Sequence, residues 1–335
     1  MSQLHVLGGT YGPTLDARGH DIGEPGLANP HNIFDPESRY THELANVTAE
    51  YVKAQLAVPD VPLTVGLNVW RSRDVRYKNV FDLCALHRTV QRAAIGAVFG
   101  SEYGVTDSNR QQHFAERVPL YLSFGPLATD AYAPVSTAVI DIEFQRQRLL
   151  AAARLGVRAV FETIGSLEEA KTVIAAVDSL EESDLPPPEY FISFVLQQSG
   201  TLIDGTPLHE AIHQLDSMAA NGNDTIPGGF GLNCCSIKSI NNALLNNANR
   251  HAIDRVGLVY PNAAGELCDT PHALESHSLA GHLVRDGVTN ESIRYLVNLG
   301  SNVIGDRSTF KAVGFCCGGL PDDNRLIAEA INSRL

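Results

Sequence analysis

The stretch VRAVFETIGSLEEAKTVIAAVDSL, residues 157–180, contains one complete unit of the fold. Its first nine residues are rich in β-branched and aromatic side chains and end at a glycine, which predicts a strand over residues 157–165. Ser166 follows, with Glu169 three positions later, and this pair is the sequence signature of a capping box. A helix is therefore expected over residues 166–180. A strand that leads directly into a helix is the building block of parallel α/β folds.

The same alternation continues along the chain in both directions. Further strands are predicted over residues 4–9, 61–70, 118–126, 189–196, 228–233, 254–262, 301–305 and 311–317. Further helices are predicted over residues 38–56, 81–100, 141–156, 206–218, 236–247, 290–300 and 321–335. About eight strand–helix units without a linker indicate one α/β domain over residues 1–335, a single (β/α)8 TIM barrel. A dinucleotide-binding fold loses its main support, because GGTYGPTLDARG, residues 8–19, does not fit the G-x-G-x-x-G fingerprint.

Four of the six cysteines form two doublets at predicted strand ends. Cys234 and Cys235 stand in GGFGLNCCSIKS, residues 228–239, and Cys316 and Cys317 stand in AVGFCCGG, residues 312–319. In a (β/α)8 barrel the carboxyl ends of the strands meet at one mouth, where active sites are built. The two doublets are therefore expected to converge in space although they lie far apart in the sequence.

Convergent cysteines suit a catalytic zinc site at this mouth. Zinc binds four tetrahedral ligands and prefers thiolate sulfur, so three cysteines leave one position for a substrate. Glycines around the second doublet would permit the sharp turn that two adjacent ligands need. The alternative is that these cysteines are small buried apolar residues, as free cysteines often are. Cys84 is expected in the core, and Cys268, in a polar loop, has no obvious partner.

The two cysteine segments resemble the metal signatures of a known family. GFGLNCCS and AVGFCCGGLPDDNRLI are similar to those of the zinc-dependent homocysteine S-methyltransferases. That family includes betaine- and S-methylmethionine-dependent enzymes and the homocysteine domain of cobalamin-dependent methionine synthase. VRAVFETIGSLEEAK, FISFVLQQSGTLIDGTPLHEAI and VGLVYPNAAGELCD agree in the same order. The resemblance extends from about residue 118 to the C-terminus, and more loosely over the rest.

The resemblance implies a metal, a reaction and a set of site residues. Cys234, Cys316 and Cys317 would be the zinc ligands, and Glu162 would act in catalysis and hold the substrate's amino group. The residues implied in substrate binding are Gly8, Gly9, Glu162, Asn233, Tyr260 and Asn262. The zinc-activated thiolate of homocysteine, or of a related thiol, would take a methyl group from a sulfonium or betaine-type donor, giving methionine or a thioether.

The chain departs from the family pattern in three places. Leu7 stands where the family has an aspartate that contacts the substrate amine. Trp70 and Arg71 replace a threonine-rich segment; Arg71 and Arg73 are candidates for binding a carboxylate, and Trp70 for facing a methylated cation. DRSTFK, residues 306–311, reads as an insertion before the second doublet. The long segment over residues 100–117 is expected to cover the site or to mediate an oligomer contact.

Net charge and composition limit the kinds of molecule that the protein is expected to bind. The formal net charge is −13 and no Lys/Arg-rich run occurs, so the surface repels phosphate backbones and nucleic acid is an unexpected partner. The first residues, MSQLHVLGGTYG, lack the pattern of a signal peptide, and no apolar run approaches the length of a membrane span. A cytoplasmic protein with reduced cysteines is expected. Its partners would be a small-molecule thiol and a methyl donor, with a homo-oligomer as an open possibility.

Two further hypotheses compete with methyl transfer. One is a zinc hydrolase, which ranks low because three thiolates make a zinc-bound water a poor acid. The other is a barrel without catalysis, or one with an altered thiol substrate, which the replacement at Leu7 keeps open. His209 and His213 are spaced for metal binding on one helix, but two exposed helix residues explain the pair more simply.

Overall fold

We describe the protein from a computed structural model. The structure describes residues 4–8, 23–24, 27–28, 39–58, 61–68, 84, 88, 120–127, 141–182, 184–221, 225–263 and 287–334. Trp70, Arg71, Arg73, Cys268, Gly9 and residues 100–117 lie outside these ranges, so the expectations about them remain predictions.

Eight parallel strands close into a barrel in the order β1-β10-β9-β8-β7-β6-β5-β4. Their bounds are β1 Leu4–Gly8, β4 Leu63–Asn68, β5 Leu120–Phe124, β6 Arg158–Ile164, β7 Tyr190–Phe194, β8 Gly229–Asn233, β9 Val256–Tyr260 and β10 Lys311–Gly314. β1 pairs with both β10 and β4 in parallel, and these two ladders close the sheet. β2 (Gly23–Glu24) and β3 (Leu27–Ala28) form a separate antiparallel pair. The (β/α)8 barrel that the sequence predicts is confirmed.

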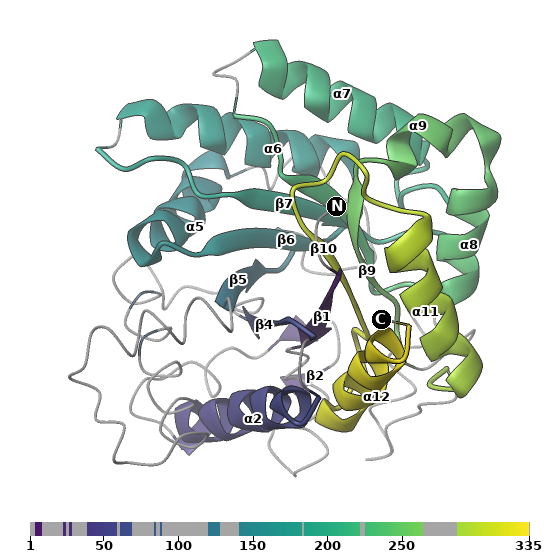
Figure 1. Ribbon diagram of the computed structural model, residues 1–335. Helices are drawn as coiled ribbons and strands as arrows, with labels where there is room; N and C mark the ends of the chain where they lie inside the picture. The colour runs from purple at the N-terminus through teal and green to yellow at the C-terminus, as the bar shows by residue number, and fades with distance from the viewer. Residues whose placement is uncertain are drawn as a thin grey trace.

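Helices surround the strands on the outside (Figure 1). They are α2 Arg39–Leu56, α5 Ile142–Leu155, α6 Leu167–Asp178, α7 Leu208–Asn221, α8 Ile237–Leu245, α9 Arg250–Ile253, α11 Asn290–Asn302 and α12 Pro321–Asn332, with short 3-10 turns η2 Ser179–Glu182 and η3 Asn247–Asn249. The Ser166 hydroxyl caps α6 by accepting from the Glu169 N–H, which is one of the two hydrogen bonds of the predicted capping box. The Glu169 carboxylate accepts from the Leu127 N–H beyond the end of β5, so the cap region also fixes that neighbouring loop.

One predicted strand is wrong. Ser301 and Asn302, at the start of the expected strand over residues 301–305, form the last turn of α11. The N–H groups of Val303 and Ile304 then bond back to the Leu299 carbonyl and finish the helix end. The apolar residues of this short segment belong to a helix terminus, and the eighth barrel strand is β10.

Residues 306–311 lie at the amino end of β10, away from the cysteine doublet. The Phe310 ring lies 4.6 Å from the His5 ring and 6.1 Å from the Phe191 ring, and the Arg158 guanidinium lies 4.6 Å from its centre. Ser308 bonds to the Phe310 and Gly228 carbonyls. This segment therefore closes the bottom of the barrel and does not reach the site at its mouth.

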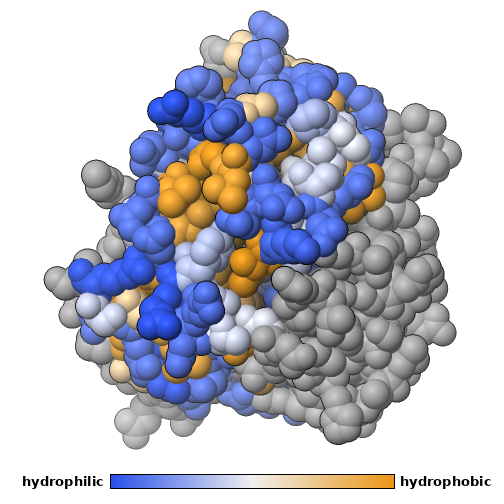
Figure 2. All heavy atoms as spheres, turned by 90° about the vertical axis from the view of Figure 1, so that its right-hand side faces the viewer, coloured by the Kyte–Doolittle hydropathy of each residue, from blue (hydrophilic) through white to orange (hydrophobic). Residues whose placement is uncertain are grey.

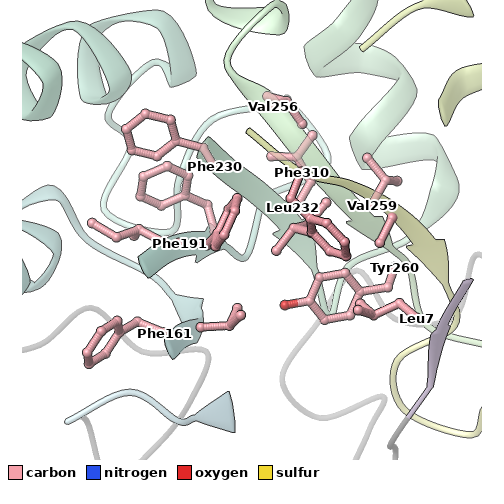
Figure 3. Close-up of a cluster of buried hydrophobic side chains, with 14 of the residues drawn as sticks. Leu7, Phe161, Phe191, Phe230, Leu232, Val256, Val259, Tyr260 and Phe310 are labelled. Atoms are coloured by element: carbon pink, nitrogen blue, oxygen red, sulfur yellow. The ribbon is translucent and has the colours of Figure 1, made fainter. Parts of the chain in front are cut away.

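Buried apolar side chains of the strands and helices form a packed core. Figure 3 shows Phe161, Phe191, Phe230, Leu232 and Val259 among its side chains, and all of these are buried. Phe161, Leu232 and Val259 directly precede Glu162, Asn233 and Tyr260, which face the mouth, so the alternation along a strand turns these three apolar side chains toward the surrounding helices.

The described surface is mostly hydrophilic with separate apolar patches on the face in Figure 2. The large apolar side chains that are most exposed among the described residues come from separate parts of the chain: Ile142, Met218, Ile226, Leu245 and Val303. No helix among the described residues has the length and apolar character that crossing a membrane requires. A homo-oligomer remains a prediction.

Candidate metal centre and active site

The two cysteine doublets meet at the mouth of the barrel. Cys234 follows the last residue of β8, and Cys316 and Cys317 follow β10 by two and three residues. The Cys234 Sγ atom lies 2.8 Å from that of Cys316 and 3.8 Å from that of Cys317. All three sulfur atoms lie within 4.8 Å of one another. The convergence predicted from the positions of the strand ends is confirmed.

Backbone hydrogen bonds hold the second doublet in place. The Cys316 N–H donates to the Pro261 carbonyl (2.7 Å), and the Ala263 N–H donates to the Cys317 carbonyl (2.9 Å). Gly318 has a φ of 83°, which glycine adopts without strain, so the chain turns sharply after Cys317. The loop after β9 and the loop after β10 thus brace each other, and the thiols are positioned by the fold itself.

The three sulfurs suit a thiophilic metal ion. In a tetrahedral zinc site with bonds of about 2.3 Å, sulfur atoms lie roughly 3.8 Å apart. The separation between Cys234 and Cys317 matches this edge, and the closer pair would open by about 1 Å. Cys316 is buried and Cys317 is half-buried, so one side of the cluster faces the mouth. Among the described residues this is the one group of metal-ligating side chains.

The protonation state of the three cysteine thiols depends on whether a metal cation is bound to them. Contacts with the Cys234 and Cys317 thiols, together with burial, raise the pKa of Cys316 well above its usual range. Without a cation, the Cys316 sulfur is therefore a protonated thiol at neutral pH. A bound metal would replace that proton, because metal ligation requires the thiolate.

Glu162, near the end of β6, is a buried carboxyl group in the same mouth. The pKa of Glu162 is raised to about 8, mainly by burial and also by the nearby Cys234, while the hydroxyls of Ser123, Tyr260 and Tyr121 oppose the shift. The Tyr121 hydroxyl lies 3.5 Å from the Glu162 Oε1 atom. At neutral pH this carboxyl is largely protonated, and a cation placed beside it would favour its ionised form.

Tyr260 and Asn262 carry polar atoms that the protein leaves unsatisfied. The Tyr260 hydroxyl and both polar side-chain atoms of Asn262 are buried without a hydrogen-bond partner among the described residues. The Tyr260 hydroxyl lies close enough to Glu162 and Ser193 to influence the pKa values of Glu162 and Tyr260. Its position does not, however, meet the distance and angle of a hydrogen bond to either residue. Unsatisfied buried groups are costly, so these atoms point to a ligand at this position.

The other predicted site residues lie around the same mouth. Asn233 ends β8, and its side chain is buried between the ends of β6, β7 and β10. Gly8 ends β1, and a β-carbon there would overlap the Asn324 amide of α12 and crowd the Tyr51 ring of α2, so a larger residue would have to displace the Asn324 side chain. Leu7 is buried in the apolar cluster that also contains Tyr260 (Figure 3).

Other metal and cysteine expectations are also resolved. The His209 ring nitrogen lies 3.0 Å from the Asn249 side-chain oxygen, and His213 is exposed, which favours the simpler interpretation of two helix surface residues. Cys84 is buried in the core, as expected, and its thiol contacts the Ala151 carbonyl.

Thr163 is a site residue that the sequence did not reveal. It follows Glu162 and has a φ of 60°, a left-handed backbone that β-branched residues rarely adopt. The register between β6 and β7 shifts at this point, between Phe161 and Ile164. No pattern in the sequence marks the strain, because a threonine in an apolar run normally predicts regular strand.

The family model of the homocysteine S-methyltransferases matches residues 6–331 of the chain. The chain belongs to this family. It is therefore an enzyme of methyl transfer, and homocysteine is the acceptor that gives the family its name.

Two further comparisons accompany this assignment. The homocysteine methyltransferase MmuM from Escherichia coli, solved in its apo form, is similar in structure over 99% of this chain and 96% of that one, with a TM-score of 0.57 and 19% identity. At that identity the likeness supports the fold alone. No curated protein sequence matches the chain.

Proposed function

We propose that the protein is a zinc-dependent S-methyltransferase that methylates the sulfur of homocysteine from a small sulfonium or betaine-type donor. The observation that carries this proposal is the group of three cysteine sulfurs at the barrel mouth, beside a buried carboxyl group. Within a family of homocysteine methyltransferases, this arrangement fits a site that binds and deprotonates a thiol.

Zinc, when bound, would lower the pKa of a substrate thiol and hold it as a thiolate at neutral pH. Cys234, Cys316 and Cys317 would hold the metal and leave one position open. A new bond forms between the substrate sulfur and the methyl carbon, and the bond from that carbon to the donor's sulfur or nitrogen breaks. The electron pair stays with the donor, which leaves without its positive charge, and the thiol proton goes to solvent when the thiol binds.

Glu162 would hold the amino group of the acceptor. Its carboxyl is largely protonated when buried alone, so binding an ammonium group would displace its proton. The unsatisfied Tyr260 hydroxyl and Asn262 amide lie at and just beyond the end of β9 and would complete their hydrogen bonds with the ligand. These groups would hold the acceptor in one orientation for the reaction.

The choice between homocysteine and a related thiol depends on the β1 end of the site. Leu7 is apolar and buried, so β1 does not contribute the second carboxylate that the family resemblance leads one to expect at this position. A thiol that lacks an amino group is therefore the second candidate acceptor. A reducing compartment such as the cytoplasm would keep the cluster as thiols.

A thiol and donor panel tests the proposal. Zinc-loaded protein is incubated with homocysteine or 4-mercaptobutyrate and with S-methylmethionine or glycine betaine, and products are identified by mass spectrometry. We expect methionine from homocysteine with one of the donors, and loss of turnover in Cys316→Ser. Cys235→Ser is the matched control, because Cys235 lies outside the sulfur group and should leave turnover intact. Equal turnover in Cys316→Ser and the control would refute the proposal.

A further inference from the structure

Asn233 is a fully buried side chain at the centre of the barrel mouth, directly before Cys234. Its Oδ1 atom accepts hydrogen bonds from the Thr163 N–H (3.0 Å) and the Ser193 hydroxyl (2.7 Å). Its Nδ2 atom donates to the Thr163 hydroxyl (2.9 Å) and points at the Cys316 Sγ atom 3.9 Å away. One amide therefore joins the ends of β6, β7 and β10.

The orientation of this amide follows from its partners. A backbone N–H can only donate, so the Asn233 atom that faces the Thr163 N–H must be the oxygen. The NH2 group then necessarily faces the Thr163 hydroxyl and the Cys316 sulfur. Both acceptor sites and both donors of the side chain are used within the protein, which leaves none for a substrate.

The contacts with Thr163 hold a strained backbone. Thr163 has a φ of 60°, and two of the four bonds of the Asn233 amide, one to the backbone and one to the hydroxyl, fix it there. Glu162 precedes it, so the same contacts set the direction in which the Glu162 carboxyl enters the mouth. Cys234, on the other side of Asn233, also has a positive φ, of 52°.

The contact with Cys316 reaches the metal cluster. An N–H group that points at a ligating sulfur orients that ligand and withdraws part of its negative charge, as outer-shell groups commonly do in metal sites. We infer that Asn233 is a positioning residue that couples the Glu162 carboxyl to the Cys316 ligand. This differs from the substrate contact that the family resemblance implies for Asn233, and it rests on the metal site of the proposed function.

Cobalt binding tests the contact with the metal cluster. Co²⁺ is titrated into reduced protein, with the sulfur-to-cobalt charge-transfer absorbance as the signal and a chelator competing for the ion. We expect Asn233→Ala to weaken Co²⁺ binding by roughly 10–100-fold and to shift the charge-transfer band. Ser193→Ala is the matched control, because it removes a bond to the same amide but leaves the contact with Cys316, and it should bind Co²⁺ as the wild type does.

A double variant tests the contacts with Thr163. Glycine adopts a φ of 60° freely, so Thr163→Gly no longer needs the amide to hold its backbone. In Asn233→Ala we expect a raised KM for homocysteine together with weakened metal binding. In the double variant Asn233→Ala/Thr163→Gly the KM should recover in part, while the Co²⁺ affinity stays low.

The possible outcomes separate this inference from the proposed function. A wild-type protein that binds no Co²⁺ overturns both. A wild type that binds Co²⁺, together with a folded Asn233→Ala variant of unchanged affinity and spectrum, overturns the inference alone. If Asn233→Ala is unfolded by circular dichroism, Asn233→Ser replaces it, since serine keeps a polar group but is too short to reach Cys316.

Discussion

Glu162 has a pKa that is shifted far from the ordinary value of a carboxyl group. Its pKa rises from 4.5 to about 8 because the barrel excludes water from it. Between these two values the folded protein binds a proton that the unfolded chain has released. The free energy of unfolding that depends on Glu162 is therefore highest below about pH 4.5, and it falls as the pH rises through about 8.

Replacing Glu162 with glutamine should remove that pH dependence. In zinc-free, reduced protein, we expect the free energy of unfolding of the wild type to fall relative to Glu162→Gln between about pH 5 and pH 8. Urea unfolding at several pH values measures the difference. Glu168→Gln, which removes an exposed carboxylate from α6, controls for the change in net charge. A difference between wild type and Glu162→Gln that stays constant with pH would contradict the assigned pKa.

At this scale the sequence predicted the side chains better than the contacts between them. The location of the cysteines and of Glu162 at the mouth could be predicted, because each stands at a strand end in a segment that resembles the family. The strained Thr163 and its bonds to Asn233 could not, because they join residues 70 positions apart that only barrel closure brings together. Hydrogen bonding between strand ends depends on distances that no local pattern encodes.

Among the elements, β10 is directly preceded by Phe310, an aromatic plug at the bottom of the barrel. Phe310→Ala should lower the free energy of unfolding by about 3–5 kcal/mol, because it empties a buried ring site between His5, Phe191 and the Arg158 guanidinium. Urea unfolding measures this, with Phe310→Leu as the milder control. Zinc content should not change, since the plug lies at the opposite end of the barrel from the cysteines. A loss of stability below about 1 kcal/mol would show that the ring is not packed as described.

The sequence predicted helices and strands correctly wherever a capping residue or a regular spacing of apolar residues marked them. Asp141 and Gly156 bound α5 as expected, and Ser166 caps α6. The expected strand over residues 301–305 failed because the apolar residues of a helix terminus and those of a short strand have the same composition. The capping bonds back to Leu299 decide the matter, and they become visible only in three dimensions.

In the whole molecule, closure of the sheet creates the site. β1 joins β10 to β4, and α2 lies beside α12 over that seam (Figure 1). The count of strand–helix units predicted the barrel, because eight units favour closure over an open sheet. Closure then brings the ends of β6, β8, β9 and β10 to one mouth. Folding and metal binding should therefore depend on each other.

Metal binding should release protons and stabilise the fold. The Cys316 thiol is protonated at neutral pH, and thiols ordinarily titrate near pH 8.5. Adding Zn²⁺ to reduced, metal-free protein at pH 7 should thus release about two to three protons per chain and raise the melting temperature. A pH-indicator titration in weak buffer and a thermal melt measure the two effects. Stoichiometric zinc binding that released no protons would mean that the ligands are not these thiols.

The central claim is that Cys234, Cys316 and Cys317 hold one zinc ion. Elemental analysis of freshly purified, reduced protein, beside Cys316→Ser and the control Cys235→Ser, tests it most directly. We expect about one zinc per chain in the wild type and in Cys235→Ser, and far less in Cys316→Ser. Equal zinc in all three proteins, or none in any of them after zinc supplementation, would contradict the claim.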